Sequence, residues 1–165
     1  MTAIRDSIVP AKNVTIRAAA GLIFTEDGHY LLQCRDNNPE IAFPDELSLF
    51  GGRVKKSEGP AEGLRRELRE ELELEAGAIS YFSQIVYDAI LGDGTTHQRY
   101  YFEVPIDISI FNALILHEGA GMRLMGGDDI AREFTRIIPY DLAFVRLHMR
   151  LRQARALGAG AGKIR

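Results

Sequence analysis

Three glutamates lie close together in the segment Arg65-Arg66-Glu67-Leu68-Arg69-Glu70-Glu71. In a helix, Glu67 is three residues from Glu70 and four from Glu71, so the three carboxylates occupy neighbouring positions on one face. Like charges at that spacing repel each other, and the helix gains nothing from them. A hard divalent cation reverses the sign of the interaction, because Mg²⁺ is bound by carboxylate oxygens together with waters and phosphates. The cluster is therefore a candidate site for Mg²⁺, or for Mn²⁺ in its place.

A solvated face of mixed charge is the alternative for the same helix. Arg66 is four residues from both Glu62 and Glu70, so it can neutralise each of them through an i,i+4 pair. Runs of charge on a helix are usually solvated surface. The helix by itself leaves both interpretations open.

The helix that carries the glutamates is predicted to begin at Pro60. Proline suits the first helical position, and Gly59 before it is a tolerable N-cap. Leu64, Leu68 and Leu72 repeat every four residues and make a stripe that faces the core. This periodicity makes the segment the clearest helix in the chain.

Fixed spacings upstream of the helix decide between the two interpretations. The pair Gly51-Gly52 ends a strand-like run, and glycines there let the backbone turn sharply and bring a carbonyl close to a ligand. Gly52 is followed at set intervals by Glu58, Arg66-Glu67-Leu68, Glu70-Glu71 and Leu74. The segment resembles the Nudix box, with all specified positions but one matched, and agreement by chance at so many spacings is negligible. The order of elements over residues 14–157 is also similar to that of a Nudix domain.

The position that departs from the motif is Glu73, where the family has glycine. That glycine usually lets the helix end sharply. We therefore expect the helix here to run at least to Leu74 and on towards Gly77, which can supply a left-handed C-cap. The departure affects the geometry after the ligands and leaves the ligands themselves in place.

The resemblance implies roles for the matched residues. The implied metal ligands are three carboxylates and one main-chain carbonyl: Glu67, Glu70, Glu71 and Gly51. Arg66 and Glu58 would orient the carboxylates through a buried polar network. One carboxylate of the cluster, with Glu70 among the candidates, or else Glu118, would accept the proton of an attacking water.

Two further residues carry open alternatives. Arg35, at the end of the second strand-like run, stands where many family members use an arginine against substrate phosphate or base, or it is simply an exposed strand-end arginine. Glu118 lies between His117 and Gly119-Ala120-Gly121, where many members supply one more carboxylate as ligand or general base. A solvated loop residue is the alternative for Glu118, and His117 is expected to be incidental.

The rest of the chain predicts an α/β fold, with a mixed sheet between helices as in the Nudix α/β/α sandwich. Strand-like runs cover residues 13–25, 30–34, 79–91 and 99–106, and an Asp-Gly turn at Asp27-Gly28 predicts a hairpin between the first two. A second helix is predicted from Tyr140 to about Leu157. The length of 165 residues indicates one domain over 1–165, with its core at about 14–157 and a flexible tail at 158–165.

Composition excludes several classes of protein. The hydrophobic fraction of 46% and charged fraction of 26% are those of an ordinary globular protein. A net charge of −3 without a basic run argues against a nucleic-acid partner. The single Cys34 excludes an internal disulfide and is expected to be a packed thiol. Neither a signal peptide nor a membrane span is recognisable, so a cytoplasmic location is expected.

These observations predict a Mg²⁺-dependent hydrolase that cleaves the phosphoanhydride bond of a nucleoside diphosphate linked to another moiety. Hydrolysis of damaged nucleoside triphosphates and a non-catalytic, nucleotide-sensing Nudix domain are the alternatives. Members of the family that isomerise prenyl diphosphates have an added catalytic cysteine near the strand before the motif. Residues 47–50 and their loop lack a cysteine, so this activity is disfavoured. The expected partner is a small nucleotide, and a homodimer stays open. The loops at 36–46 and 112–129 carry no recognisable substrate signature.

Overall fold

The computed structural model describes residues 14–88 and 95–161, without the side chains of 14, 15 and 159–161. The strands are β1 (Val14–Phe24), β2 (Tyr30–Cys34), β3 (Leu47–Ser48), β4 (Gly51–Arg53), β5 (Ser80–Asp88), β6 (Thr96–Pro105) and β7 (Gly121–Met125). The helices are α1 (Pro60–Leu72), α2 (Ile108–Phe111), α3 (Gly127–Arg132) and α4 (Pro139–Ala161), with a 3₁₀ turn at Phe134–Arg136.

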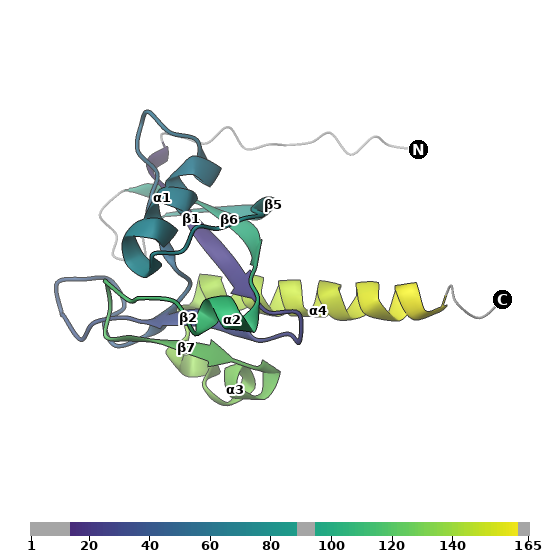
Figure 1. The fold of residues 1–165 in the computed structure, drawn as a ribbon. Helices are drawn as coiled ribbons and strands as arrows, with labels where there is room; N and C mark the ends of the chain where they lie inside the picture. The colour runs from purple at the N-terminus through teal and green to yellow at the C-terminus, as the bar shows by residue number, and fades with distance from the viewer. Residues whose placement is uncertain (1–13, 89–94, 162–165) are drawn as a thin grey trace, which may run out of the picture.

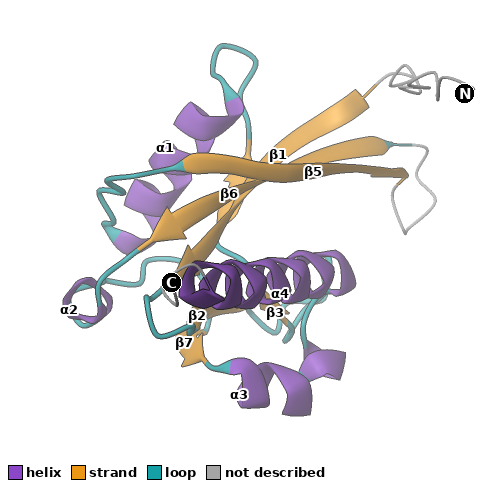
Figure 2. Cartoon of the chain, turned by 90° about the vertical axis from the view of Figure 1, so that its right-hand side faces the viewer, coloured by secondary structure: helices purple, strands orange, loops and turns teal. Residues whose placement is uncertain are grey.

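The strands form one mixed sheet with helices on both faces. Its order is β3-β2-β1-β6-β5, with β4 added to β1 and β7 to β2. β1 and β6 pair in parallel, and the other strand pairs of the described residues are antiparallel. α1 lies on one side of β1, β5 and β6, and α4 on the other (Figures 1 and 2). Two cores result, one under α1 around Phe50 and Leu68, the other under α4 around Tyr101 and Val145. The predicted α/β/α sandwich is confirmed.

The predicted hairpin at Asp27-Gly28 is present but short. β1 and β2 pair antiparallel at Phe24 and Tyr30, and the strands then part. On one side, the middle of β1 pairs with β4. On the other side, β1 pairs with β6 over its whole length. This central position of β1 brings the turn at Gly51 against the middle of the sheet.

α1 begins where it was predicted but ends earlier. Its first turn is closed by the Glu62 carboxylate, which accepts the N–H of Gly59 at 2.8 Å. The helix stops at Leu72, because Glu73 takes a left-handed conformation with φ 54° and ψ 26°. The N–H of Glu73 then reaches the carbonyl of Arg69 at 3.0 Å, and Leu74 turns back into the core. The expectation that the helix would continue towards Gly77 is wrong.

The other predicted elements match with shifted ends. α4 starts at Pro139 and continues to Ala161, so residues 158–161 are helical where a flexible tail was expected. The runs at 79–91 and 99–106 correspond to β5 and β6, and residues 89–94 between them lie outside the described part of the chain. In the ranges 14–88 and 95–161, no helix is long and apolar enough to cross a membrane.

Candidate active site

The turn at Gly51-Gly52 lies directly against the side chains of α1. Gly51 has φ +129°, and a Cβ there would come within 2.2 Å of the Ala19 carbonyl oxygen. A Cβ on Gly52 would lie 2.6 Å from the carboxylate carbon of Glu67. Position 51 therefore requires glycine, whereas a Cβ on Gly52 would displace the Glu67 carboxylate, which rests on the backbone of the turn.

Glu71 is the buried carboxylate of the cluster. It is 5% exposed, and its Oε2 accepts the N–H of Gly51 at 3.1 Å. Burial raises the pKa of Glu71 to about 8, and the nearby charges of Glu118 and Glu67 act in the same direction, against the Gly51 hydrogen bond and the more distant Arg99. These shifts also show that Glu118 and Glu67 lie within electrostatic reach of Glu71.

Arg66 organises the acidic side chains around it. Its guanidinium donates to both oxygens of Glu58, at 3.2 and 2.7 Å, and to the carbonyl of Arg53 at 2.9 Å. Its Nη1 also donates to Glu67 at 2.8 Å and to Glu70 at 2.9 Å. The Arg66 guanidinium, with the N–H of Lys55, holds the pKa of Glu58 at about 2.

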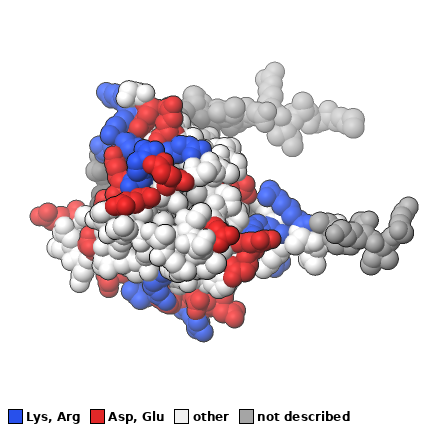
Figure 3. Space-filling view, viewed as in Figure 1, with Lys and Arg blue, Asp and Glu red and all other residues white. Residues whose placement is uncertain are grey.

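Exposure decides against a purely solvated face. The side chains of Arg66, Glu58 and Glu67 are 18%, 14% and 16% exposed, so this network is largely buried. Glu70 is 56% exposed and forms the outer edge of the network. Over α1, acidic and basic side chains are interleaved on the surface (Figure 3).

Glu118 comes to this site from a distant part of the sequence. It lies in the loop between α2 and β7, and its carbonyl accepts the Nε2 of Gln33 at 3.2 Å. The residue before it, His117, donates its N–H to the carbonyl of Glu71 at 2.8 Å. His117 also bonds through Nε2 to Glu73, at 2.7 Å. The histidine that we expected to be incidental thus connects this loop to α1.

Arg35 borders the same region. With Gln33, Asp36, Ile41, Glu118 and Gly119 it lines a small cavity of about 80 Å³. Its Nε donates to the carbonyls of Ala42 and Phe43, both at 3.1 Å. Arg35 therefore lies beside Glu118 and also holds the 36–46 loop, so it is not a free strand-end arginine.

Two contributors to the site were missed from the sequence. Gln33 is 6% exposed; it accepts the Ser48 hydroxyl at 3.2 Å and donates to the carbonyl of Glu118. The sequence signal that could have identified it is an amide side chain inside the apolar run Tyr30-Leu31-Leu32-Gln33-Cys34. The fully buried Asp141 binds Arg99 at 3.0 and 3.1 Å and accepts the N–H of Leu49 at 3.0 Å, just ahead of the glycine turn. No local pattern in the sequence signals that pair.

The donors at the end of α1 suit a hard cation. Among the described residues, no three acidic, histidine or cysteine side chains form a ready-made metal cluster, since Arg66 lies between Glu67 and Glu70. Burial, however, raises the pKa of Glu71, the charges of Glu118 and Glu67 act in the same direction, and a divalent cation would reverse that repulsion. The available donors are all oxygens, as Mg²⁺ prefers.

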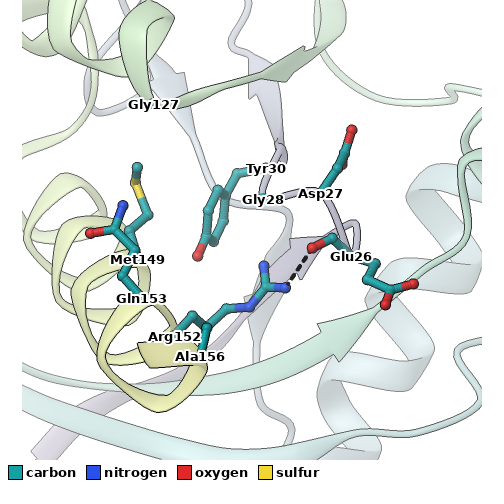
Figure 4. Close-up of a pocket in the computed structure, with 9 residues that line it drawn as sticks. All are labelled: Glu26, Asp27, Gly28, Tyr30, Gly127, Met149, Arg152, Gln153 and Ala156. Atoms are coloured by element: carbon teal, nitrogen blue, oxygen red, sulfur yellow. Dashed lines mark hydrogen bonds between the residues drawn. The ribbon is translucent and has the colours of Figure 1, made fainter. Parts of the chain in front are cut away.

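A larger hollow lies elsewhere in the molecule. It measures about 340 Å³ and lies between the β1–β2 turn and α4, where Arg152 donates to the carbonyls of Thr25 and Glu26 (Figure 4). None of its lining residues belongs to the segment 51–74. We place the candidate site at α1, because the Gly51-Gly52 turn and the carboxylates of Glu67 and Glu71 lie together there.

Comparison with known proteins finds a relative that is similar to part of the chain. The nucleoside triphosphatase NudI of Enterobacter sp. (strain 638) is 36% identical over 89 residues, which are 52% of this chain and 62% of the relative. The chain thus spans less than two thirds of that relative's length.

Solved structures share the fold. The E. coli ORF135 protein has a TM-score of 0.66 and 25% identity, over 85% of this chain and 92% of that one. A MutT protein from Methanosarcina mazei Go1 has a TM-score of 0.64 and 20% identity, over 83% and 94%. The model of the NUDIX domain matches residues 14–123, which include the glycine turn, α1 and Glu118. With this match over most of its length, the chain belongs to the Nudix family.

Proposed function

We propose that this chain is a Mg²⁺-dependent hydrolase of nucleotide phosphoanhydrides, acting as one domain. The observation that carries the proposal is the buried Glu71 carboxylate bonded to the Gly51 N–H, with the charges of Glu118 and Glu67 acting on it and Arg66 holding Glu67 and Glu70. Mg²⁺ bound by Glu67, Glu70, Glu71 and the Gly51 carbonyl would supply charge neutralisation on the phosphate oxygens.

The side chains of the site have distinct tasks in this proposal. Glu58 and Arg53 hold the Arg66 guanidinium, which in turn fixes the carboxylate of Glu67. Glu118 accepts a proton from the attacking water, because it lies outside the Arg66 network and near Glu71. Arg35 binds a substrate phosphate at the edge of the small cavity that it shares with Glu118.

Two substrate classes remain to be separated. A nucleoside diphosphate linked to another moiety is our first candidate. Nucleoside triphosphates, including damaged ones, are the second, and the similarity to the nucleoside triphosphatase NudI favours them. A panel of both classes incubated with the protein and Mg²⁺, with products separated by chromatography, distinguishes the two. Release of pyrophosphate or phosphate supports the second class, and two nucleotide-derived or sugar-derived monophosphates support the first.

A non-catalytic sensor of nucleotides is the competing function. Among the structures with this fold is the NUDIX domain of Shewanella oneidensis NrtR in complex with ADP ribose, with a TM-score of 0.64 and 15% identity over 82% of this chain and 88% of that one. Calorimetric binding of a nucleotide without turnover at saturating Mg²⁺ would establish the sensor and overturn the hydrolase. The intact set Glu58, Arg66, Glu67, Glu70 and Glu71 supports turnover.

A further inference from the structure

Glu73 occupies a backbone conformation that glycine would occupy at lower cost. Its φ of 54° lies in the left-handed region, where a Cβ approaches the following carbonyl. Glycine has no such penalty, which is why it is the usual residue at this point of a helix end. A glutamate here is therefore less stable than the family's glycine, unless its side chain contributes elsewhere.

The side chain of Glu73 has one contact of that kind. Its Oε1 lies 2.7 Å from Nε2 of His117, and the two side chains are 55% and 47% exposed. Exposed pairs of this type add little to global stability. The contact between Glu73 and His117 is therefore too weak to explain the left-handed glutamate by its contribution to global stability. Its role is to hold the segment that contains His117.

The segment that it holds also caps α1. The N–H of Ile115 donates to the carbonyl of Leu72 at 3.2 Å, and the N–H of His117 to the carbonyl of Glu71 at 2.8 Å. These are carbonyls of the last turn, which find no partner within the helix. Residues 115–117 thus lie along the end of α1 and are tied to it by two main-chain bonds and one side-chain bond.

Glu118 follows directly after this tie. On its other side, its carbonyl is held by Gln33 of β2. The backbone at Glu118 is thereby held between the end of α1 and the sheet, and the charge of its side chain acts on Glu71.

We propose that Glu73 is a positioning residue, which holds Glu118 at the catalytic site through its hydrogen bond to His117. The inference rests on the proposed function, because Glu118 is given a catalytic task there. Glu73 and His117 touch neither substrate nor metal in this proposal. Glutamate in place of glycine at position 73 makes the end of α1 less stable, and its side chain helps to hold Glu118 in position.

The experiment compares four variants with the wild type. Glu73→Gly removes the tie and relieves the backbone, and His117→Ala removes the tie from the other side. Glu73→Gln keeps the length and a side chain that can bond either tautomer of the imidazole. Glu75→Ala is the matched control, because it breaks an exposed pair with Arg69 at the same helix end without contact to residues 115–118.

The first readout is independent of turnover. Amide hydrogen exchange at His117, followed by NMR in metal-free protein, should be about two- to fivefold faster in Glu73→Gly and His117→Ala, the change that an exposed pair can provide. Glu73→Gln and Glu75→Ala should exchange like the wild type. The melting temperature of Glu73→Gly should equal or exceed that of the wild type, since glycine suits the left-handed position. Unchanged exchange at His117 in Glu73→Gly overturns the inference.

The second readout is the split between kcat and KM. The loss of an exposed pair allows about a two- to fivefold effect, so we expect kcat to fall by about that factor in both tie-breaking variants, with KM nearly unchanged. The kcat of the double variant Glu73→Gly/His117→Ala should be no lower than that of either single variant, because both changes remove the same hydrogen bond. In a Glu118→Gln background, Glu73→Gly should change kcat by less than about twofold. If Glu73→Gly lowers kcat as much in the Glu118→Gln protein as in the wild type, the role assigned to Glu73 is overturned.

The two readouts separate this inference from the proposed function. If the wild type cleaves no nucleotide, the proposed function fails, and exchange at His117 alone decides whether the tie exists. If the wild type is active and Glu73→Gly is equally active, the proposed function stands and the positioning role is overturned.

Discussion

The carboxylate of Glu71 accepts the N–H of Gly51 at 3.1 Å, and this bond connects the buried end of α1 to the Gly51-Gly52 turn. The same carboxylate faces the charges of Glu67 and Glu118. One side chain therefore links the fold of the turn to the electrostatics of the site. Glutamine at position 71 keeps the hydrogen bond to the turn and removes the charge, so it separates the structural role of Glu71 from its electrostatic role.

Glu71→Gln should remove most hydrolysis while the fold remains intact. The amide oxygen can still accept the Gly51 N–H, and the metal-free carboxyl, with its pKa at about 8, is already largely neutral at neutral pH, so the fold should change little, whereas the amide cannot supply the charge that a bound cation needs. Steady-state rates and thermal unfolding of the variant and wild type check this. Glu75→Gln, an exposed exchange near the same helix end, should keep full activity. A near-normal rate in Glu71→Gln would mean that this carboxylate is only structural.

Hydrolysis should require a divalent cation and stop in excess chelator. The reason is that the charges of Glu118 and Glu67 act against that of Glu71, and a divalent cation would reverse this repulsion. Activity lost to chelation should return with Mg²⁺, and with Mn²⁺ as the alternative ion. Circular dichroism before and after chelation serves as the control for folding. Full turnover in excess chelator contradicts the mechanism.

Glu118→Gln should lower kcat by roughly 10²–10⁴-fold with little change in KM, which is the usual contribution of a general base. The acidic limb of the pH–rate profile should disappear with it. A titration with Mg²⁺ distinguishes a base from a ligand, because only a ligand variant is rescued by more metal. An unchanged kcat would assign the base to Glu67, Glu70 or Glu71.

Asp141→Asn should lower the free energy of unfolding by about 3–5 kcal/mol, because it leaves the largely buried Arg99 guanidinium without a charge partner. Urea denaturation of the variant measures the loss. Exchanging Arg99→Gln as well should cost less than the sum of the two single changes, since no unpaired charge then remains. A loss no larger than that of an exposed pair would show that the Arg99–Asp141 pair contributes little.

The stability of the protein should fall as the pH decreases below about 6.5, through His148. Both ring nitrogens of this buried residue are used by the neutral form, with Tyr30 donating to Nδ1 at 2.6 Å and Nε2 donating to Glu103 at 2.9 Å. Burial lowers the pKa of His148, and Arg152 and Arg155 act in the same direction against the bond to Glu103.

The sign of this dependence follows from proton uptake. Below the ordinary pKa of 6.5 the unfolded chain binds a proton that the folded chain excludes, so stability is lost as the pH falls towards the folded pKa. Urea midpoints at several pH values measure it, and His148→Gln should flatten this region. The lowered pKa of Glu103 acts in a more acidic window and leaves a separate loss there. A wild-type stability that rises on acidification through pH 6.5 would contradict the assignment.

The sequence alone determined α1 and the chemistry that it carries. The leucine repeat is a local pattern with the helical period, and Leu64, Leu68 and Leu72 are all fully buried as it predicts. The spacing from Gly52 to Glu71 sets which side chains can meet, because the turn and the helix between them are both local structures. The glycine turn and the Arg66 network therefore follow from short-range rules.

Only the tertiary structure decided where α1 ends and what lies beside it. The end of α1 gains its partners from Ile115, which donates to Leu72, and from His117, which bonds to Glu71 and Glu73; both lie more than forty residues away along the chain. Glu118 reaches Glu71, and Asp141 reaches Leu49, through the same kind of long-range contact. Local preferences contain no information on such pairs, since they depend on the order of strands in the sheet, and that order is set by packing of the whole chain.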